Sequence, residues 1–292
     1  MNKKILAVAM ALLIAVMSIA FAACKNDKPN AETTAPSNDG ATEAAGSNTD
    51  FDADWNYITG KGSLTIGITE YRPMNFKDSE GNLTGFDTEF AKAVCEKLGL
   101  KAEFIVINWA TKESELKSKA IDCIWNGLTV TEQRKENMDF TTPYMNNFQV
   151  IVTKAELADQ ITSLEDMKEL AFVAESESSG ESAIKANAVL SECKYTGVDY
   201  QATALREVLA GTADAAVLDS VMAFSSIKED TSFSSLKAIT DFELQSEQYA
   251  IAFRKDCGKT LEVVNATIAE LIADGTLKTL AEKYGIEQSL AV

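Results

Sequence analysis

The most informative absence in this 292-residue chain is histidine, which does not occur at all. Histidine is the usual general base, the commonest zinc ligand and the middle member of Ser-His-Asp and Cys-His catalytic arrangements, so those classes are excluded. The five cysteines contain no Cys-x-x-Cys pair, the spacing typical of a cysteine-held metal site. We therefore expect neither a bound metal nor a cofactor.

Positive charge is also scarce. The chain has 27 Lys and Arg against 44 Asp and Glu, which gives a formal net charge of −17. A nucleic-acid-binding surface needs an excess of basic side chains to meet the phosphates. We therefore expect no nucleic-acid partner.

The first residues are typical of a secretory signal peptide. Lys3 and Lys4 are followed by a charge-free apolar run, residues 5–23, that ends in two alanines. A run of about 20 apolar residues could instead be a simple transmembrane anchor. However, Phe21-Ala22-Ala23-Cys24 resembles a bacterial lipobox, with phenylalanine where that pattern usually has leucine. We predict a signal peptide over residues 1–23 and a lipid on Cys24 that anchors the protein at the outer face of the membrane.

Residues 24–55 contain almost no large apolar side chains and are rich in Asn, Asp, Thr, Ala, Ser and Gly. Such a segment cannot bury enough surface to offset the entropy lost on ordering. We predict a flexible tether between the membrane and a globular part. The other cysteines, Cys95, Cys123, Cys193 and Cys257, are widely scattered. They could pair in a secreted protein or remain as buried free thiols, and the sequence leaves both possibilities open.

Strand and helix patterns alternate through the globular part. Residues 64–68, 102–107 and 121–125 are predicted strands, separated by predicted helices over residues 88–98 and 113–119. A second series begins near residue 163, with strands over 170–174 and 213–218 and helices over 182–190 and 201–209. A return strand over 249–253 precedes helices over 261–274 and 277–284. The alternation predicts two α/β lobes with mostly parallel sheets, the first lobe being completed by the C-terminal segment.

Four local patterns carry a family resemblance. They are Gly85-Phe86-Asp87-Thr88-Glu89-Phe90, residues 122–134 with the following Asp139-Phe140-Thr141-Thr142-Pro143-Tyr144, Asp214-Ala215-Ala216-Val217-Leu218-Asp219, and residues 164–180. Together they resemble the family 3 solute-binding proteins, the polar amino-acid receptors of bacterial ABC importers, over nearly all of residues 60–286. In the first pattern we expect Asp87 to cap the following helix and Phe86 to enter the core, so this pattern identifies the family without touching ligand.

The resemblance implies a periplasmic-binding-protein-like fold, with two hinge crossings near residues 146–149 and 242–248 and the ligand in the interlobe cleft. The implied boundaries are residues 56–147 for the first part of lobe 1, 148–246 for lobe 2 and 247–292 for the completion of lobe 1. The implied partners are a free amino acid and the ABC permease of the same importer, with the receptor acting as a monomer at the extracellular face of the membrane.

The same resemblance implies roles for individual residues. Arg134 binds the ligand's α-carboxylate as a two-bond fork, helped by Thr129 and by Ser178, with Ser179 beside it. Asp219 neutralises the α-ammonium, and a carbonyl at Asn126 or Gly127 accepts from it. Without the resemblance, Arg134 would be interpreted as a member of a surface ion pair and Asp219 as the cap of the following helix. Glu169 and Glu177 stand where the family commonly has glycine, which puts the shape of the loop before Ser178 in question.

Fewer residues are expected to contact the side chain of the ligand. Tyr71 and Trp109 occupy positions at which related receptors place aromatic rings around the ligand, although both could be ordinary core residues. Glu70 and Glu175 lie at or near positions that read the substrate side chain, which favours a basic, glutamine-like or cystine-like amino acid. An alternative is a dehydratase-type enzyme on the same scaffold that acts on a cyclic carboxylic acid, with Glu175 as the acid. A sensory domain is a third reading, for which no output segment follows Val292.

Overall fold

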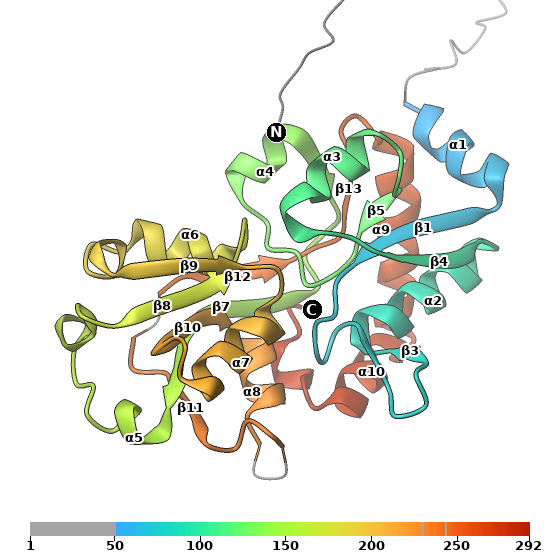
Figure 1. The fold of residues 1–292 in the computed structure, drawn as a ribbon. Helices are drawn as coiled ribbons and strands as arrows, with labels where there is room; N and C mark the ends of the chain where they lie inside the picture. The colour runs from blue at the N-terminus through green and yellow to red at the C-terminus, as the bar shows by residue number, and fades with distance from the viewer. Residues whose placement is uncertain (1–50, 229–230, 243) are drawn as a thin grey trace, which may run out of the picture. The chain divides into compact units, whose positions relative to one another are not determined.

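The structure is a computed structural model that describes residues 51–228, 231–242 and 244–292 (Figure 1). The signal peptide predicted for residues 1–23, the lipid on Cys24 and the tether as far as residue 50 lie outside the described residues. None of the helices in the described ranges combines the length and the apolar character that a membrane span requires.

The first lobe is built on a five-stranded sheet with the order β4-β1-β5-β13-β6. Its strands are β1 (Ser63–Ile68), β4 (Lys101–Val106), β5 (Cys123–Ile124), β6 (Met138–Phe140) and β13 (Ala252–Arg254). All residues of β1 are buried, because this strand lies between parallel neighbours and is covered on its faces by packed side chains. A small hairpin of β2 (Phe76–Lys77) and β3 (Leu83–Thr84) follows β1.

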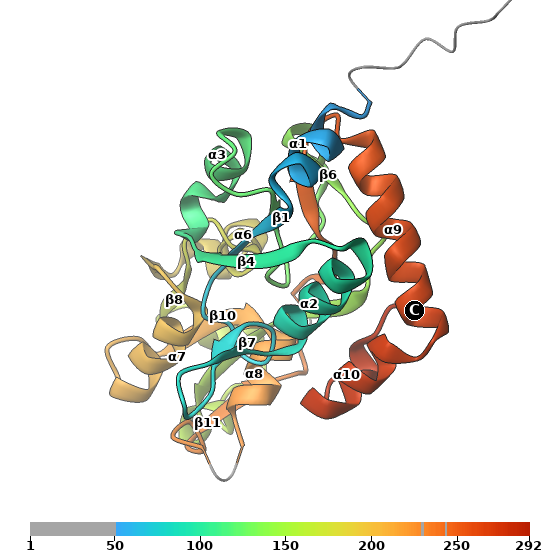
Figure 2. The same ribbon diagram turned by 90° about the vertical axis from the view of Figure 1, so that its right-hand side faces the viewer.

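Helices flank this sheet. α2 (Phe86–Leu98), α9 (Gly258–Ala273) and α10 (Thr276–Tyr284) pack on one another, and Figure 2 shows them grouped beside β4. Apolar residues at helical spacing on α2, including Phe90, Ala91 and Val94, are fully buried. α1 (Ala53–Lys61) contacts α9, and the short helices η1 (Trp109–Thr111), α3 (Lys112–Lys117) and α4 (Glu132–Asn137) lie near the carboxyl ends of the strands.

The second lobe has its own sheet with the order β11-β7-β10-β8-β9. Its strands are β7 (Met145–Lys154), β8 (Ala171–Glu175), β9 (Lys194–Val198), β10 (Ala215–Asp219) and β11 (Leu236–Ile239). The helical elements are α5 (Ala155–Ala158), η2 (Leu164–Met167), α6 (Ser179–Ala186), η3 (Leu190–Glu192), α7 (Gln201–Ala210) and α8 (Ser220–Ser226), while η4 (Glu287–Ser289) closes the described chain. The parallel core of this sheet, β10-β8-β9, ends at Asp219, Glu175 and Val198. The first two place carboxyl groups at the edge of the sheet where open α/β folds bind ligands.

Two strands connect the lobes. The first half of β7 pairs antiparallel with β12 (Ser246–Tyr249), from Ser246 opposite Phe148 to Tyr249 opposite Met145. β7 then continues into the second sheet, whereas the chain after β12 enters β13 of the first sheet. This antiparallel pair forms the two crossings, and the predicted two-lobe α/β fold is confirmed.

Several local expectations need correction. The sheets are mixed rather than mostly parallel, because β13 in the first sheet and β7 in the second run antiparallel to their neighbours. The predicted tether extends too far: the carbonyl of Phe51 accepts from Lys259 N (3.1 Å), and Asp54 forms an ion pair with Arg254 (2.6 Å). The helix predicted from residue 182 begins at Ser179. Cys95, Cys123, Cys193 and Cys257 are free thiols.

Candidate ligand-binding site

A small enclosed cavity lies between the lobes at the carboxyl ends of the strands. We call it the ligand cavity, and the space free of protein atoms within it measures about 260 Å³. The first lobe lines it with Trp109, Asn126, Gly127, Thr129 and Arg134, and the second with Glu175, Ser178, Ser179, Gln201 and Asp219. All of these except Gln201 were singled out from the sequence. Residues from both lobes are therefore needed to close this space.

Arg134 is a buried cation without an ionic partner. It lies in α4, whose first turn is set by Thr131, because the Thr131 side chain accepts from Arg134 N (3.1 Å). The guanidinium is drawn inward and donates to the carbonyls of Thr129 (Nη1–O 2.8 Å) and Glu177 (Nη2–O 3.3 Å). It is 8% exposed and makes no ion pair within the described ranges. Burial lowers the pKa of Arg134 from its usual range, although the nearby carboxyl groups of Glu247 and Glu113 oppose the shift.

Asp219 is a buried anion that, among the described residues, accepts hydrogen bonds from neutral side-chain donors and makes no ion pair. It ends β10, and its side chain makes no capping hydrogen bond to the following helix, which excludes the helix-cap interpretation. Its Oδ1 accepts from Asn147 Nδ2 (2.8 Å) and Gln149 Nε2 (2.5 Å), and its Oδ2 accepts from Gln201 Nε2. These amides hold the carboxylate in position without supplying a positive charge.

The turn from Asn126 to Thr129 depends on a buried carboxyl group in α2. Gly127 has a positive φ of 57°, and its N–H donates to Asp87 Oδ2 (2.7 Å). Asp87 Oδ1 accepts from Tyr144 OH (2.8 Å), and burial raises the pKa of Asp87 to about 7. The predicted capping role of Asp87 is therefore wrong. The residue at the start of α2 is Gly85, and Asp87 instead supports the binding turn from behind.

The two aromatic residues differ in position. Trp109 lines the ligand cavity, and its buried indole N–H has no hydrogen-bond partner in the part of the chain that the structure describes. Tyr71 does not line the cavity. Its ring lies behind Gly127, where a Cβ at position 127 would meet Tyr71 Cε1 at 2.5 Å, and its hydroxyl pairs with Tyr249 OH (2.7 Å). Only the Trp109 half of the expected aromatic pair faces the space available to a ligand.

The loop before α6 keeps a glycine-like conformation without glycine. Glu177 has a φ of 59°, a left-handed conformation that glycine adopts most readily. This turns its carbonyl towards Arg134 and Lys112 of the first lobe, at 3.3 and 3.1 Å. Ser178 then begins α6, with its side chain accepting from Glu181 N (3.2 Å). Although residue 177 is glutamate and not glycine, Ser178 still lines the ligand cavity.

Further buried charges surround the ligand cavity. Glu175 is 4% exposed, and its side-chain carboxyl group has no hydrogen-bond partner among the described residues. Burial, followed by the charge of Asp219, raises the pKa of Glu175 to about 8. Glu247 on β12 accepts from Asn147 Nδ2 (2.5 Å) and Gln149 Nε2 (2.8 Å), and burial and Asp219 raise its pKa as well. Lys112 donates to the carbonyls of Trp109 and Glu177 (both 3.1 Å), and burial lowers its pKa to about 8.

Sequence reasoning missed Gln201, Glu247 and Lys112 as contributors to this environment. No motif marks Gln201 or Lys112, while Glu247 fell inside a segment predicted only as a hinge. Glu70 was predicted near the ligand, but it lines a neighbouring cavity and not the ligand cavity. Within residues 51–228, 231–242 and 244–292, no three His, Cys, Asp or Glu side chains come together as a metal site would require.

Known proteins share this architecture. Residues 64–287 match the family described as bacterial extracellular solute-binding proteins, family 3. The chain is 29% identical over 236 residues to the L-cystine-binding protein TcyJ of Escherichia coli, covering 78% of this chain and 85% of that one. It is 31% identical over 232 residues to the L-cystine-binding protein TcyA of Bacillus subtilis, covering 79% and 84%. An ancestral amino-acid-binding protein described as a precursor of cyclohexadienyl dehydratase has 33% identity and a TM-score of 0.71, covering 78% of this chain and 98% of that one.

Proposed function

Because this chain belongs to the bacterial extracellular solute-binding proteins, family 3, we propose that it captures a free polar α-amino acid in the ligand cavity. The observation that carries this proposal is the pair of Arg134 and Asp219. Both line the same small cavity, both are buried, and neither has an oppositely charged partner within the described part of the chain. An unpaired buried charge is costly, so each requires an ionic ligand group. An amino-acid zwitterion supplies a carboxylate for Arg134 and an ammonium for Asp219.

The remaining wall residues complete the recognition of the zwitterion. The backbone N–H of Thr129 and the N–H and hydroxyl groups of Ser178 donate to the carboxylate. The Thr129 hydroxyl lies towards the ammonium, from which a carbonyl at Asn126 or Gly127 accepts. Arg134 already donates to Thr129 O from one nitrogen, which fixes the plane of its guanidinium before ligand arrives. Such preorganisation limits the entropy lost on binding.

Trp109 and Glu175 face the ligand's side chain. The unpaired indole N–H of Trp109 is a donor, and the unpaired carboxyl group of Glu175 accepts from an ammonium, guanidinium or amide. Both groups are buried, so a purely apolar side chain would leave them unsatisfied. This supports a basic, glutamine-like or cystine-like substrate. The names of the related L-cystine-binding proteins point to the same class.

Binding is coupled to closure of the lobes. Arg134 and Thr129 belong to the first lobe, Asp219 and Ser178 to the second, so neither lobe alone satisfies both charged ends of the ligand. The ligand therefore binds the closed arrangement more strongly than an open one and shifts the population towards it. The crossings through β7 and β12 are the hinge, at the boundaries proposed between residues 56–147, 148–246 and 247–292.

The captured amino acid is passed to the permease of an ABC importer, which recognises the closed form. The receptor works as a monomer at the extracellular face of the cell membrane, held by the lipid on Cys24 and separated from the membrane by the tether. Radiolabelled palmitate incorporation in the native chain and in Cys24→Ala tests the anchor, because only the native chain should be labelled. Label in both would refute this part of the proposal.

An enzymatic function is less well supported. Glu175 is an acid of raised pKa on the cavity wall, and one similar structure is named as a dehydratase precursor. A cyclic carboxylic acid without an ammonium group, however, would leave Asp219 unneutralised. Incubation with prephenate-type acids tests this alternative, and turnover that is lost in Glu175→Gln would replace the receptor proposal by an enzyme.

The receptor proposal is tested by calorimetric titration of the full chain in detergent, after bound ligand has been removed under denaturing conditions. The ligands are the twenty standard amino acids, ornithine and cystine. We expect micromolar or tighter dissociation constants for a few polar members, lost in Arg134→Ala and Asp219→Ala and kept in the exposed control Lys135→Ala. Absence of binding to every ligand would refute the proposal.

A further inference from the structure

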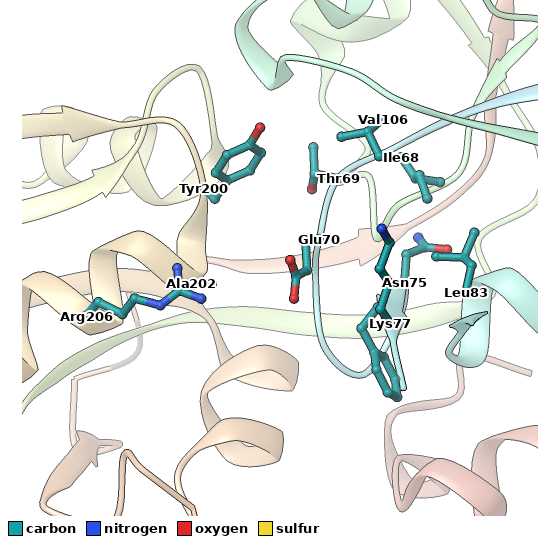
Figure 3. A pocket seen from close by; sticks show the side chains of 11 residues that line it. Ile68, Thr69, Glu70, Asn75, Lys77, Leu83, Val106, Tyr200, Ala202 and Arg206 are labelled. Carbon is teal, nitrogen blue, oxygen red and sulfur yellow. The ribbon is translucent and has the colours of Figure 1, made fainter. Parts of the chain in front are cut away.

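A second cavity lies beside the ligand cavity in the same interlobe space (Figure 3). The space free of protein atoms within it measures about 740 Å³, against about 260 Å³ for the ligand cavity, and both lobes line it. The two cavities are lined by neighbouring residues. On the first lobe Asn126 lines the ligand cavity and Thr69 lines the second cavity. Two hydrogen bonds join these residues: Thr69 N donates to Asn126 Oδ1 (2.9 Å), and Asn126 Nδ2 donates to Thr69 Oγ1 (2.7 Å). On the second lobe Gln201 lines the first cavity and its neighbours Tyr200 and Ala202 line the other.

Opposite charges face each other across the second cavity. Glu70 follows β1 in the first lobe and Arg206 lies on α7 of the second, and Figure 3 shows their side chains extending towards one another. Neither makes an ion pair or a side-chain hydrogen bond within the described ranges. Both are accessible to solvent, so an incoming ligand group can reach them.

The charged residues that line the second cavity do not favour a ligand side chain that ends in a single positive charge. Lys77 also lines the second cavity, so two cations accompany one anion. A guanidinium or ammonium bound to Glu70 would lie near Lys77 and Arg206, and this repulsion opposes it. A group that carries both charges avoids the conflict, with its ammonium at Glu70 and its carboxylate at Arg206. The wall also offers apolar surface, since Val106 is 64% exposed at this place and Ile68 lies beside it.

We propose that the second cavity binds a second amino-acid head, meaning an α-carbon with its ammonium and carboxylate groups. The substrate is then a two-headed amino acid of the cystine type, which carries one such head at each end. This rests on the proposed function, in which Arg134 and Asp219 hold the first head. The Cα atoms joined by a disulfide are typically about 4.4–6.8 Å apart. A disulfide therefore joins two heads over a short distance, which suits cavities lined by the hydrogen-bonded neighbours Thr69 and Asn126. In this arrangement the ligand's disulfide bridge lies next to Asn126 of the first lobe and Gln201 of the second.

The test compares two-headed with one-headed ligands on the full chain in detergent. L-Cystine and L-cystathionine carry two heads, whereas S-methyl-L-cysteine carries one. Cystathionine has a thioether bridge and cannot exchange with the half-buried thiol of Cys193. The variants are Glu70→Gln and Arg206→Gln, with the exposed residues Glu96→Gln and Lys194→Gln as matched controls.

We expect both two-headed ligands to bind the native chain at least about tenfold more tightly than S-methyl-L-cysteine. Glu70→Gln and Arg206→Gln should each reduce that ratio of dissociation constants by about tenfold, while the controls keep it. Equal affinity for one-headed and two-headed ligands would overturn the inference and leave the receptor function intact. Tighter binding of arginine than of cystine, weakened by Glu70→Gln but not by Arg206→Gln, would also overturn it, assigning the cavity to a cationic side chain. If no amino acid binds, both this inference and the receptor function fail.

Discussion

Arg134 of the first lobe and Glu177 of the second are joined directly, because the guanidinium Nη2 donates to the Glu177 carbonyl at 3.3 Å. The same carbonyl accepts from Lys112 Nζ at 3.1 Å. Two buried cations of one lobe therefore converge on one backbone oxygen of the other. The left-handed conformation of Glu177, with φ 59°, presents that oxygen to them. The closed arrangement is thus stabilised by the same residue that we propose binds the ligand's carboxylate.

Replacing Arg134 should weaken ligand binding without lowering the free energy of unfolding of the ligand-free protein. In Arg134→Met we expect at least about a thirtyfold loss of affinity, because removing one partner of a buried hydrogen-bonded charge pair costs about 2–5 kcal/mol. The free energy of unfolding without ligand should not fall, since the variant no longer buries an unpaired cation. Calorimetric titration and urea unfolding measure the two quantities, with Lys135→Met as the exposed control. A ligand-free variant much less stable than the native chain would indicate that Arg134 is mainly structural.

Lys112 should favour the closed form. In Lys112→Met the hydrogen bond to the Glu177 carbonyl is lost, so we expect a larger radius of gyration for the ligand-free chain by small-angle scattering. Affinity should fall by about three- to tenfold, the effect of one hydrogen bond of about 1 kcal/mol. Lys117→Met, on the exposed face of the same helix, is the control. Identical scattering of the two variants would contradict a bridging role for Lys112.

Ligand binding should release protons through Glu175. Burial, followed by Asp219 and Asp199, raises the pKa of Glu175 to about 8, while Lys112 and Arg134 oppose the shift. The carboxyl group is therefore protonated in the empty closed form below that pH, and a ligand cation or donor beside it favours the carboxylate. By linkage, affinity should rise as the pH increases from about 6 to 8. Titrations in two buffers of different ionisation enthalpy report the proton release directly.

The matched variants for this prediction are Glu175→Gln and the exposed Glu192→Gln. Glu175→Gln should release fewer protons and show a flatter pH dependence, because glutamine does not titrate. Glu192→Gln should behave like the native chain. Proton release that persists unchanged in Glu175→Gln would assign it to another group, such as Glu247, whose pKa is also raised by burial.

Gly127→Ala should damage both the fold and the site. Its Cβ would lie 2.5 Å from Tyr71 Cε1 and 3.1 Å from Tyr249 Cε2, and alanine disfavours a φ of 57°. We expect a loss of about 1–3 kcal/mol in the free energy of unfolding, together with weaker binding as the turn moves. Gly81→Ala, which also has a positive φ but open space around it, is a control that isolates the conformational cost. Equal destabilisation of the two variants would exclude the steric contribution.

Much of the architecture was predictable because its signals are local. The helical spacing of residues 88–98 and the buried strand patterns around residues 64 and 215 correspond to α2, β1 and β10. The antiparallel course of β7 and β13 was not predictable in this way. Whether a strand runs parallel or antiparallel depends on where the chain re-enters the sheet, and this is settled by contacts far apart in sequence.

The sequence was enough to single out Arg134, Thr129 and Asp219 as candidates, because each belongs to a local pattern that resembles the family's. Only the tertiary structure decided that Asp87 supports the Gly127 turn, that Tyr71 lies behind that turn and that Glu70 faces a different cavity with Arg206. Glu247 and Gln149 come together across 98 positions of sequence. Local patterns encode strands and turns, whereas the partner of a buried charge is determined by how the lobes pack, and no spacing along the chain records it.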